Sequence, residues 1–375
     1  MMDQTSRFAD QLGPAKIIHV HEPALGLKAV LVVDNVAAGP AIGGLRMAPD
    51  VSTEECFRLA RAMTLKNAAA GLSHGGGKSV LTGDPKMPAA EKERLIRAFA
   101  HALRNEQDYI FGPDMGTDET CMAWVRDELK DHGGRAVGLP REIGGIPLDE
   151  VGATGFGIAN VADVAVPRCG FALNGARVVV QGFGAVGFHA ARFLAAKGAV
   201  LVGAADSRGA LHDPQGIDVA LLGRLKGEGK SVLDYPGGQK LDRDAVIDIE
   251  CDIWIPAARP DVINEANVAR LKTRLVIQGA NIPCTRGAEE AMHRNGILAV
   301  PDFIANAGGV ICAAMEYHGS SQTAAFETIA EKLRHNSREV LEAAANRGIL
   351  PRDAALDLAV TRVKKAMSFR RWSIF

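Results

Sequence analysis

Lys78 has neighbours that would suit acid–base chemistry on a small substrate. It follows three glycines in the segment His74–Ser79 (HGGGKS), and glycines let a substrate and the backbone approach each other closely. A second lysine nearby and burial would both lower the pKa of its ammonium group. Such a lysine acts as a general base near neutral pH. The alternative is an ordinary lysine of a surface loop.

Lys66 is the second lysine. It follows Leu59 by seven residues and Met63 by three, and this spacing predicts that it lies on one apolar stripe of a helix. A lysine on a buried stripe costs free energy unless it has a partner. The alternative is a side chain that snorkels, so that its amine reaches water along an apolar surface.

Two tight turns carry polar side chains that would join this chemistry. Asp114 lies in Gly112–Thr117 (GPDMGT), and we interpret it as a proton carrier that faces the lysines. The alternative is a turn acid near the start of a helix, which is common. Asn306 lies in Pro301–Gly309 (PDFIANAGG), where it is either an amide that orients a ligand or a simple turn residue.

A dinucleotide-binding turn is predicted further along the chain, at Gly182–Gly187 (GFGAVG). Gly182 would make the turn, Gly184 would let the backbone reach a pyrophosphate, and Gly187 would let a helix pack closely on a strand. The alternative is a glycine-rich turn that binds no ligand.

The helix after this turn begins with Ala185 and Val186, and its N-terminus would offer unpaired N–H groups to phosphates. Asp206 ends the next predicted strand, 19 residues after Gly187. A carboxylate at this place accepts a hydrogen bond from a ribose 2′-hydroxyl and repels a 2′-phosphate. We therefore expect NAD rather than NADP, a preference that Arg208 would soften. The alternative is that Asp206 is a solvated loop acid.

The elements that must position these residues indicate an α/β protein of two domains. In the second half, buried β-branched strands alternate with helices, which predicts an open parallel sheet with helices on both faces. The expected strands are Ala15–Val20, Lys28–Val33, Arg177–Gln181, Ala199–Ala205, Ile253–Ile255, Leu275–Gln278 and Ile297–Val300. The expected helices are Thr53–Ala70, Ala89–Asn105, Asp118–His132, Ala185–Lys197 and the stretch Gln322–Met367.

The composition excludes several classes of protein. Of 375 residues, 47% are hydrophobic and 23% charged, as in an ordinary soluble protein, and the net charge of −1 argues against a nucleic-acid binder. No signal peptide or membrane segment is expected, and the six cysteines form no CxxC pair, so we expect a reduced, cytoplasmic protein. His19 and His21 form an HxH pair without an evident third ligand, so we expect no metal site.

Seven segments together resemble the glutamate/leucine/phenylalanine/valine dehydrogenase family, most closely its members that act on branched-chain and other apolar amino acids. The resemblance spans most of the chain and keeps the family's order of motifs. The matching segments are Gly39–Met47 (GPAIGGLRM), Met63–Pro85 (MTLKNAAAGLSHGGGKSVLTGDP), Gly112–Glu119 (GPDMGTDE), Ala153–Gly157 (ATGFG), Gln181–Gly187 (QGFGAVG), Gly279–Asn281 (GAN) and Pro301–Ile311 (PDFIANAGGVI).

The resemblance implies an amino-terminal substrate domain and a Rossmann-like domain, and the stretch 133–157, rich in Gly and Pro, indicates the joint between them. Residues 1–145 would bind substrate and other subunits, and residues 146–334 would form a Rossmann-like NAD-binding domain. The C-terminal helices, about 335–375, would pack back on the first domain. A homo-oligomer is expected, with an amino acid, its 2-oxo acid and ammonium as small-molecule partners, and with neither nucleic acid nor membrane.

The resemblance also implies the roles of single residues. Lys66 matches the lysine that holds the substrate α-carboxylate, Lys78 the lysine that activates water, and Asp114 the acid that carries protons. Further residues of the expected site are, near the substrate, Gly43 and Asn306, and near the cofactor, Thr154 and Asn281.

Two positions bear on the choice of substrate. Glutamate-specific members of the family carry a lysine where this chain has Ile42 and a serine where it has Ala313. Neither residue here would pair with a side-chain carboxylate, so we expect NAD-dependent oxidative deamination of an apolar L-amino acid, similar to Leu, Val, Ile or Phe. The alternatives are a glutamate dehydrogenase with an altered pocket and a catalytically silent NAD(H)-binding subunit.

Overall fold

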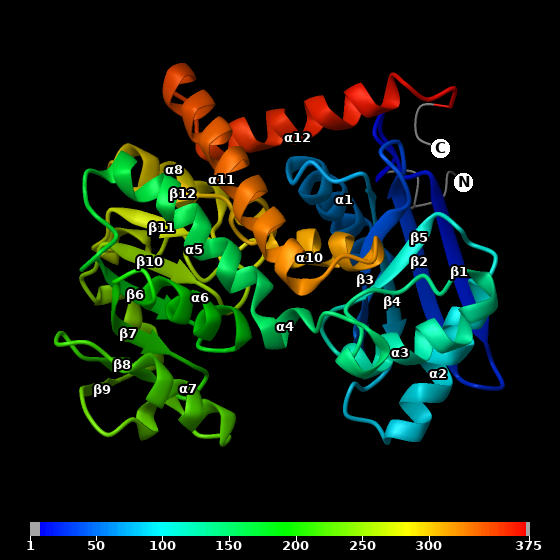
Figure 1. Ribbon diagram of the computed structural model, residues 1–375, viewed down its shortest axis with the longest axis horizontal. Coiled ribbons are helices and arrows are strands. Elements are labelled where there is room, and N and C mark those ends of the chain that lie inside the picture. The colour runs from blue at the N-terminus through cyan, green and yellow to red at the C-terminus, as the bar shows by residue number, and fades with distance from the viewer. Residues whose placement is uncertain (1–7, 373–375) are drawn as a thin grey trace. The chain divides into compact units, whose positions relative to one another are not determined.

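The computed structural model describes residues 8–372. They fold as two compact units, each with its own β-sheet (Figure 1). Within the described residues, none of the helices combines the length and the apolar composition that crossing a bilayer requires.

The chain enters each unit more than once. The first unit holds the described chain up to Leu148, Val310–Ala325 and the chain from Leu356; the second holds Asp149–Gly309 and Phe326–Ala355. This division differs from the expectation that all residues from about 335 pack on the first domain. Residues 335–355 belong to the second unit, where Arg352 pairs with Asp302 and neighbouring Arg334 pairs with Asp163.

The first unit is built on a five-stranded mixed sheet in the order β1-β2-β4-β3-β5. Its strands are β1 (Lys16–Glu22), β2 (Leu27–Asn35), β3 (Ala41–Ala48), β4 (Gly75–Thr82) and β5 (Tyr109–Pro113). The pairs β1–β2 and β2–β4 are antiparallel, whereas β3 is parallel to both β4 and β5. The register of β3 sets Leu45 opposite Ser79 on one side and Pro113 on the other, so Lys78 and Asp114 lie on strands that flank β3.

Helices cover both faces of this sheet. They are α1 (Thr53–Ala69) on one face, and α2 (Ala89–Ala102) and α3 (Glu119–Glu128) on the other. Alternate residues of β2 separate the two cores, because successive side chains of a strand point to opposite faces. Leu31 packs in the core under α2 and α3, and Val32 packs with Phe57 of α1. Lys78 points to the same face of the sheet as Val80, which also packs with α1.

The second unit contains a seven-stranded sheet in the order β12-β11-β10-β6-β7-β8-β9. Its strands are β6 (Arg177–Gln181), β7 (Val200–Ala205), β8 (Ala210–His212), β9 (Gln239–Leu241), β10 (Ile253–Pro256), β11 (Leu275–Ile277) and β12 (Leu298–Val300). The five strands from β12 to β7 are parallel, which confirms the predicted architecture, while β8 and β9 add an unpredicted antiparallel edge. The strand order reverses between β6 and β10, and parallel α/β sheets bind ligands at such a switch point.

The remaining helices complete the two units. They are α4 (Leu148–Val151), α5 (Ala153–Ala165), α6 (Ala185–Ala195), α7 (Val219–Gly227), α8 (Arg286–Arg294), α9 (Asp302–Ala305), α10 (Gly308–Tyr317), α11 (Gln322–Arg347) and α12 (Pro351–Met367). Short 3₁₀ turns lie at Lys130–His132, Arg141–Ile143, Val166–Cys169, Val232–Asp234, Arg243–Asp248 and Val268–Arg270.

The sequence pattern did not predict β3, β4 or β5. Glycine is unfavourable in strands, and it occupies two of the eight residues of β3 and the first three residues of β4. The structure shows why glycine stands there: a Cβ at Gly43 would lie 1.9 Å from the carbonyl oxygen of Gly77, and a Cβ at Gly76 would lie 1.9 Å from the backbone nitrogen of Thr64. In β3 and β4, close backbone packing takes the place of a pattern of apolar side chains, and this hides both strands from prediction.

Candidate functional site

Lys78 and Asp114 form a direct ion pair in the first unit. The Nζ atom of Lys78 lies 2.7 Å from Oδ2 of Asp114. Lys78 stands within β4 and Asp114 directly follows β5, with β3 between these strands. The lysine side chain is only 7% exposed and the aspartate side chain 20% exposed. The structure thus brings together the two side chains to which the sequence assigns proton transfer.

Gly44 of β3 leaves space beside this pair. A Cβ at Gly44 would lie 3.0 Å from Nζ of Lys78 and 2.7 Å from Cβ of Asp114. Any side chain at this position would crowd both groups. Glycine in a strand marks a place where a ligand or another backbone comes close.

Arg46 is a member of this cluster that the sequence analysis missed. Its Nε atom lies 3.0 Å from Oδ2 of Asp114, and its Nη1 atom lies 2.5 Å from Oε1 of Glu55. Burial raises the pKa of Asp114, but the charges of Lys78 and Arg46 outweigh burial and lower the pKa to about 2. Asp114 is therefore ionised at neutral pH. The signal for Arg46 was its place two residues after Gly44, which has meaning only once β3 is known to be a strand.

Lys66 occupies a flank of α1 rather than its buried face. The buried residues of the helix are Cys56, Phe57, Ala60, Thr64, Asn67, Ala68 and Ala69. Lys66 is half-buried, as are Leu59 and Met63, so the predicted buried stripe is wrong by a small rotation about the helix axis. The next residue, Asn67, is fully buried and donates a hydrogen bond of 2.7 Å to the carbonyl oxygen of Gly75, which ties the Lys66 end of α1 to β4.

Ile42 and Ala313, the two predicted side-chain pocket residues, lie in one apolar cluster of the first unit. Both are buried, together with Ile110, Val137 and Ala314. Ala313 reaches this cluster because α10 belongs mainly to the first unit.

Gly43 does not contribute an open surface. Its missing side chain faces the carbonyl of Gly77, and its own carbonyl accepts a hydrogen bond of 2.8 Å from the hydroxyl of Tyr109. Gly43 therefore permits the close packing of β3 on β4.

The glycine turn of the second unit fits a pyrophosphate. Gly182 has φ of +97°, and a Cβ there would lie 2.7 Å from the backbone nitrogen of Ala258. A Cβ at Gly187 would lie 2.1 Å from the carbonyl oxygen of Gly182. Both glycines are needed by the fold, whereas a Cβ at Gly184 would meet no described atom within 4 Å. Gly184 thus leaves space in front of α6, whose N-terminus has no side-chain cap.

A pocket of about 820 Å³ adjoins this turn. Its lining includes Gly182, Gly184 and Asp206, three of the residues predicted to bind a dinucleotide. Lys226, Arg243 and Arg259 also line the pocket. The sequence analysis did not identify these three positively charged side chains.

Asp206 already has a full set of donors. Its Oδ2 atom lies 2.6 Å from Nζ of Lys226 and accepts from the backbone of Val232, and its Oδ1 atom accepts from Ser231 and from the backbone of Arg208. Burial raises the pKa of Asp206, but these donors, led by Lys226, lower it to about 2. A carboxylate offers about four acceptor positions, so a ribose hydroxyl would have to displace one of these donors.

Asn306 and Asn281 contact each other in the second unit. The Nδ2 atom of Asn306 donates to Oδ1 of Asn281 at 3.0 Å and to the carbonyl oxygen of Ala280 at 3.2 Å. The buried Oδ1 atom of Asn306 has no hydrogen-bond partner among the described residues, as expected of a group that receives a donor from a ligand. Thr154 lies close by, because a Cβ at Gly309 would be 3.0 Å from its Oγ1 atom.

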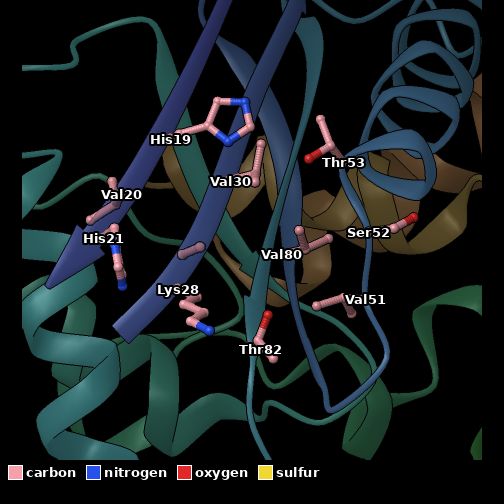
Figure 2. A pocket seen from close by; sticks show the side chains of 11 residues that line it. His19, Val20, His21, Lys28, Val30, Val51, Ser52, Thr53, Val80 and Thr82 are labelled. Atoms are coloured by element: carbon pink, nitrogen blue, oxygen red, sulfur yellow. The ribbon is translucent and has the colours of Figure 1, made fainter. Parts of the chain in front are cut away.

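The predicted HxH pair lines a separate pocket of about 360 Å³ in the first unit. Figure 2 shows His19 and His21 on β1, next to Lys28 on β2 and to Ser52 and Thr53 at the start of α1. Within residues 8–372, no group of three or more His, Cys, Asp or Glu side chains is placed to hold a metal ion.

Comparison with known proteins gives matches along most of the chain. Residues 144–371 match the family model described as Glutamate/Leucine/Phenylalanine/Valine dehydrogenase, and residues 14–131 match Glu/Leu/Phe/Val dehydrogenase, dimerisation domain. A glutamate dehydrogenase of Aeropyrum pernix is 36% identical over 359 residues, which cover 90% of this chain and 85% of the relative. The NADP-specific glutamate dehydrogenase of Saccharolobus shibatae is 35% identical over 354 residues, with coverage of 90% and 83%.

A solved structure agrees with these matches. The hetero-hexameric glutamate dehydrogenase from Thermus thermophilus, in its Leu-bound form, has a TM-score of 0.86 and 30% sequence identity. The alignment covers 95% of this chain and 90% of that chain. The chain therefore belongs to the glutamate/leucine/phenylalanine/valine dehydrogenase family, whose members are amino acid dehydrogenases.

Proposed function

We propose that this protein catalyses the oxidative deamination of an L-amino acid, and the reverse reductive amination, with a nicotinamide cofactor. In the forward direction an L-amino acid, the oxidised cofactor and water give a 2-oxo acid, ammonium, the reduced cofactor and a proton. The observation that carries the proposal is the buried Lys78–Asp114 ion pair beside Gly44. The cofactor would supply the acceptor for the hydride that leaves the α-carbon.

Three side chains of the first unit would do the remaining work. Lys66 would bind the substrate α-carboxylate. Asp114, an ionised carboxylate at neutral pH, would accept a proton from the substrate ammonium group. Lys78 is an ammonium group in the ion pair, so it would take a proton from the water that attacks the imine carbon only after its own proton has left. Because Lys78 and Asp114 are in contact, a proton gained by one can pass to the other.

Two substrate classes are candidates. The names of the relatives slightly favour a glutamate dehydrogenase with an altered pocket. The apolar cluster around Ile42 and Ala313 favours an apolar amino acid, because neither residue would pair with the side-chain carboxylate of glutamate. The first argument rests on likeness along the whole chain, and the second rests on the chemistry of two positions.

Rates on a panel of L-amino acids test the proposal. The purified protein is mixed with glutamate, leucine, valine, isoleucine and phenylalanine, each with NAD and with NADP, and formation of the reduced cofactor is followed by absorbance. Turnover that is fastest with an apolar amino acid supports the apolar candidate, and turnover that is fastest with glutamate supports the altered glutamate dehydrogenase. A complete lack of turnover contradicts the proposal and favours a silent NAD(H)-binding subunit.

The choice of cofactor depends on Asp206 and Lys226. Asp206 supports the expected use of NAD, since a carboxylate repels a 2′-phosphate. Lys226 offers the opposite charge at the same place, and it can release Asp206 to bind a phosphate because its side chain is 26% exposed. We therefore infer that the protein uses NAD and also accepts NADP.

Lys226→Met is expected to lower kcat/KM for NADP by about tenfold, the effect of losing one charge-assisted contact to a phosphate. The value for NAD should change by less than about threefold, because Asp206 keeps its carboxylate and loses only a competing donor. Steady-state rates with both cofactors measure the ratio. Lys230→Met is the matched control, since Lys230 pairs with Glu228 nearby and does not line the pocket. Equal losses for the two cofactors would contradict the assigned contact.

A homo-oligomer is also proposed. The first unit matches a family model described as a dimerisation domain, and the Thermus thermophilus relative is described as hetero-hexameric. Light scattering on the purified chain tests this proposal.

A further inference from the structure

Arg352 is the centre of a buried polar network in the second unit. It comes from the first turn of α12, and its side chain is 17% exposed. Its Nε atom lies 2.6 Å from Oε2 of Glu289, and its Nη2 atom lies 2.9 Å from Oδ1 of Asp302 and 3.0 Å from Oε1 of Gln278. Gln278 closes the network by donating to Oε1 of Glu289 at 2.7 Å.

One cation therefore compensates two carboxylates away from water. The side chains of Glu289 and Asp302 are only 4% and 7% exposed, and Gln278 is fully buried. Removing one partner of a buried ion pair leaves an uncompensated charge, which is strongly unfavourable. The forked guanidinium contacts all three groups at once, which an ammonium group cannot do in the same geometry.

Asp302 connects this network to the turn that contains Asn281. Its second oxygen, Oδ2, accepts a hydrogen bond of 2.8 Å from the backbone of Ile282. Ile282 has φ of +44°, a conformation that is unfavourable for a β-branched residue and that persists only where its surroundings hold it. The bond from Asp302 is one such constraint, and it lies one residue after Asn281.

Asp302 also holds the other asparagine of the site. Its backbone carbonyl accepts a hydrogen bond of 2.7 Å from the backbone of Asn306, at the end of the short helix α9. Asn306 is thus bonded directly to Asp302, and Asn281 is connected to Asp302 through the next residue, Ile282. A shift of Asp302 would move the two amides relative to each other.

We propose that Arg352 is a positioning residue for the nicotinamide end of the cofactor site. By holding Asp302, it fixes the Asn281–Asn306 amide pair and leaves the buried Oδ1 atom of Asn306 aimed at a ligand donor. The carboxamide NH₂ group of the nicotinamide has the chemistry to be that donor. This inference rests on the proposed function, because it assigns the amide pair to a nicotinamide cofactor.

Arg352→Lys tests the proposal, because it keeps the buried positive charge and removes the fork. The dissociation constants of NADH and of ADP-ribose, which lacks the nicotinamide ring, are measured by titration calorimetry. We expect NADH to bind at least fivefold more weakly and ADP-ribose to bind within twofold of the wild type. In steady state, KM for the oxidised cofactor should rise. A merely structural role of Arg352 would weaken both ligands together.

Arg286→Lys is the matched control. Arg286 joins the same two helices, α8 and α12, by pairing with Asp353, but this pair is more exposed and shares no hydrogen bond with Asp302 within the described residues. It should leave both dissociation constants unchanged. Asp302→Asn is the second variant, for the case that Arg352→Lys does not fold, and it should show the same loss of NADH affinity alone.

The possible failures can be told apart. Unchanged NADH affinity in both variants, or equal losses for NADH and ADP-ribose, would overturn the role of Arg352 while the wild type still binds NADH. A wild-type protein that binds neither NADH nor NADPH would overturn the proposed function, and this inference with it.

Discussion

Lys78→Ala is expected to lower turnover by roughly 10³-fold, within the range for loss of a positioned general base. The side chain is almost fully buried and contacts Asp114 at 2.7 Å, so no described neighbour of the same type can replace it at that point. NADH affinity should stay within about twofold of the wild type, because the glycine turn and Asp206 belong to the second unit. Steady-state rates and a binding titration with NADH measure the two effects.

Two further variants separate the loss of a base from the loss of a charge. Lys78→Arg keeps a cation beside Asp114, but a guanidinium group stays protonated and cannot act as a base, so turnover should stay low. Lys28→Ala removes an exposed lysine of the neighbouring strand β2 and should leave turnover unchanged. Turnover near the wild-type level in Lys78→Ala would contradict the assigned base.

The second unit was the more predictable part of the fold. Its parallel strands are short β-branched runs such as Arg177–Gln181, and its glycine turn has a spacing that few other structures require. The two edge strands β8 and β9 escaped prediction because neither contains a β-branched residue, whereas the equally short β11 and β12 do. The first unit was harder, because β3 and β4 contain glycines whose role is close backbone packing and not a pattern of side chains.

Part of the candidate site could be predicted from the sequence, because its lysine and its aspartate lie in recognisable motifs. The sequence analysis expected Asp114 to face the lysines, and the strand order shows how this contact with Lys78 arises, because β4 and β5 both flank β3. Arg46 was missed because its contact with Asp114 exists only through the register of β3 and β5.

The contacts of Asp206 could not be predicted from the sequence, for a different reason. Its position after β7 was predicted, but the donors that occupy it were not. Lys226 and Ser231 come from 20 and 25 residues further along the chain, a separation at which sequence spacing carries no information about contact. A prediction of NAD from the carboxylate alone therefore left out the lysine that pairs with it.

Ile42→Lys is expected to change the substrate preference of an apolar-specific enzyme. Ile42 is buried in the cluster with Ile110, Val137, Ala313 and Ala314, where burial makes an ammonium group unfavourable. The free variant should be less stable, and kcat/KM for leucine should fall by about 100-fold, since a buried unpaired charge opposes an apolar side chain.

The same variant should gain activity on glutamate, because the side-chain carboxylate of glutamate would pair with the new ammonium group. We expect kcat/KM for glutamate to rise by about 100-fold, as for a buried charge pair formed only with the matching substrate. Ile42→Met keeps the volume and the apolar character, so it should leave the preference unchanged. If the wild type already turns over glutamate faster than leucine, then Ile42 does not line the side-chain pocket, and another cation must bind the carboxylate of the substrate.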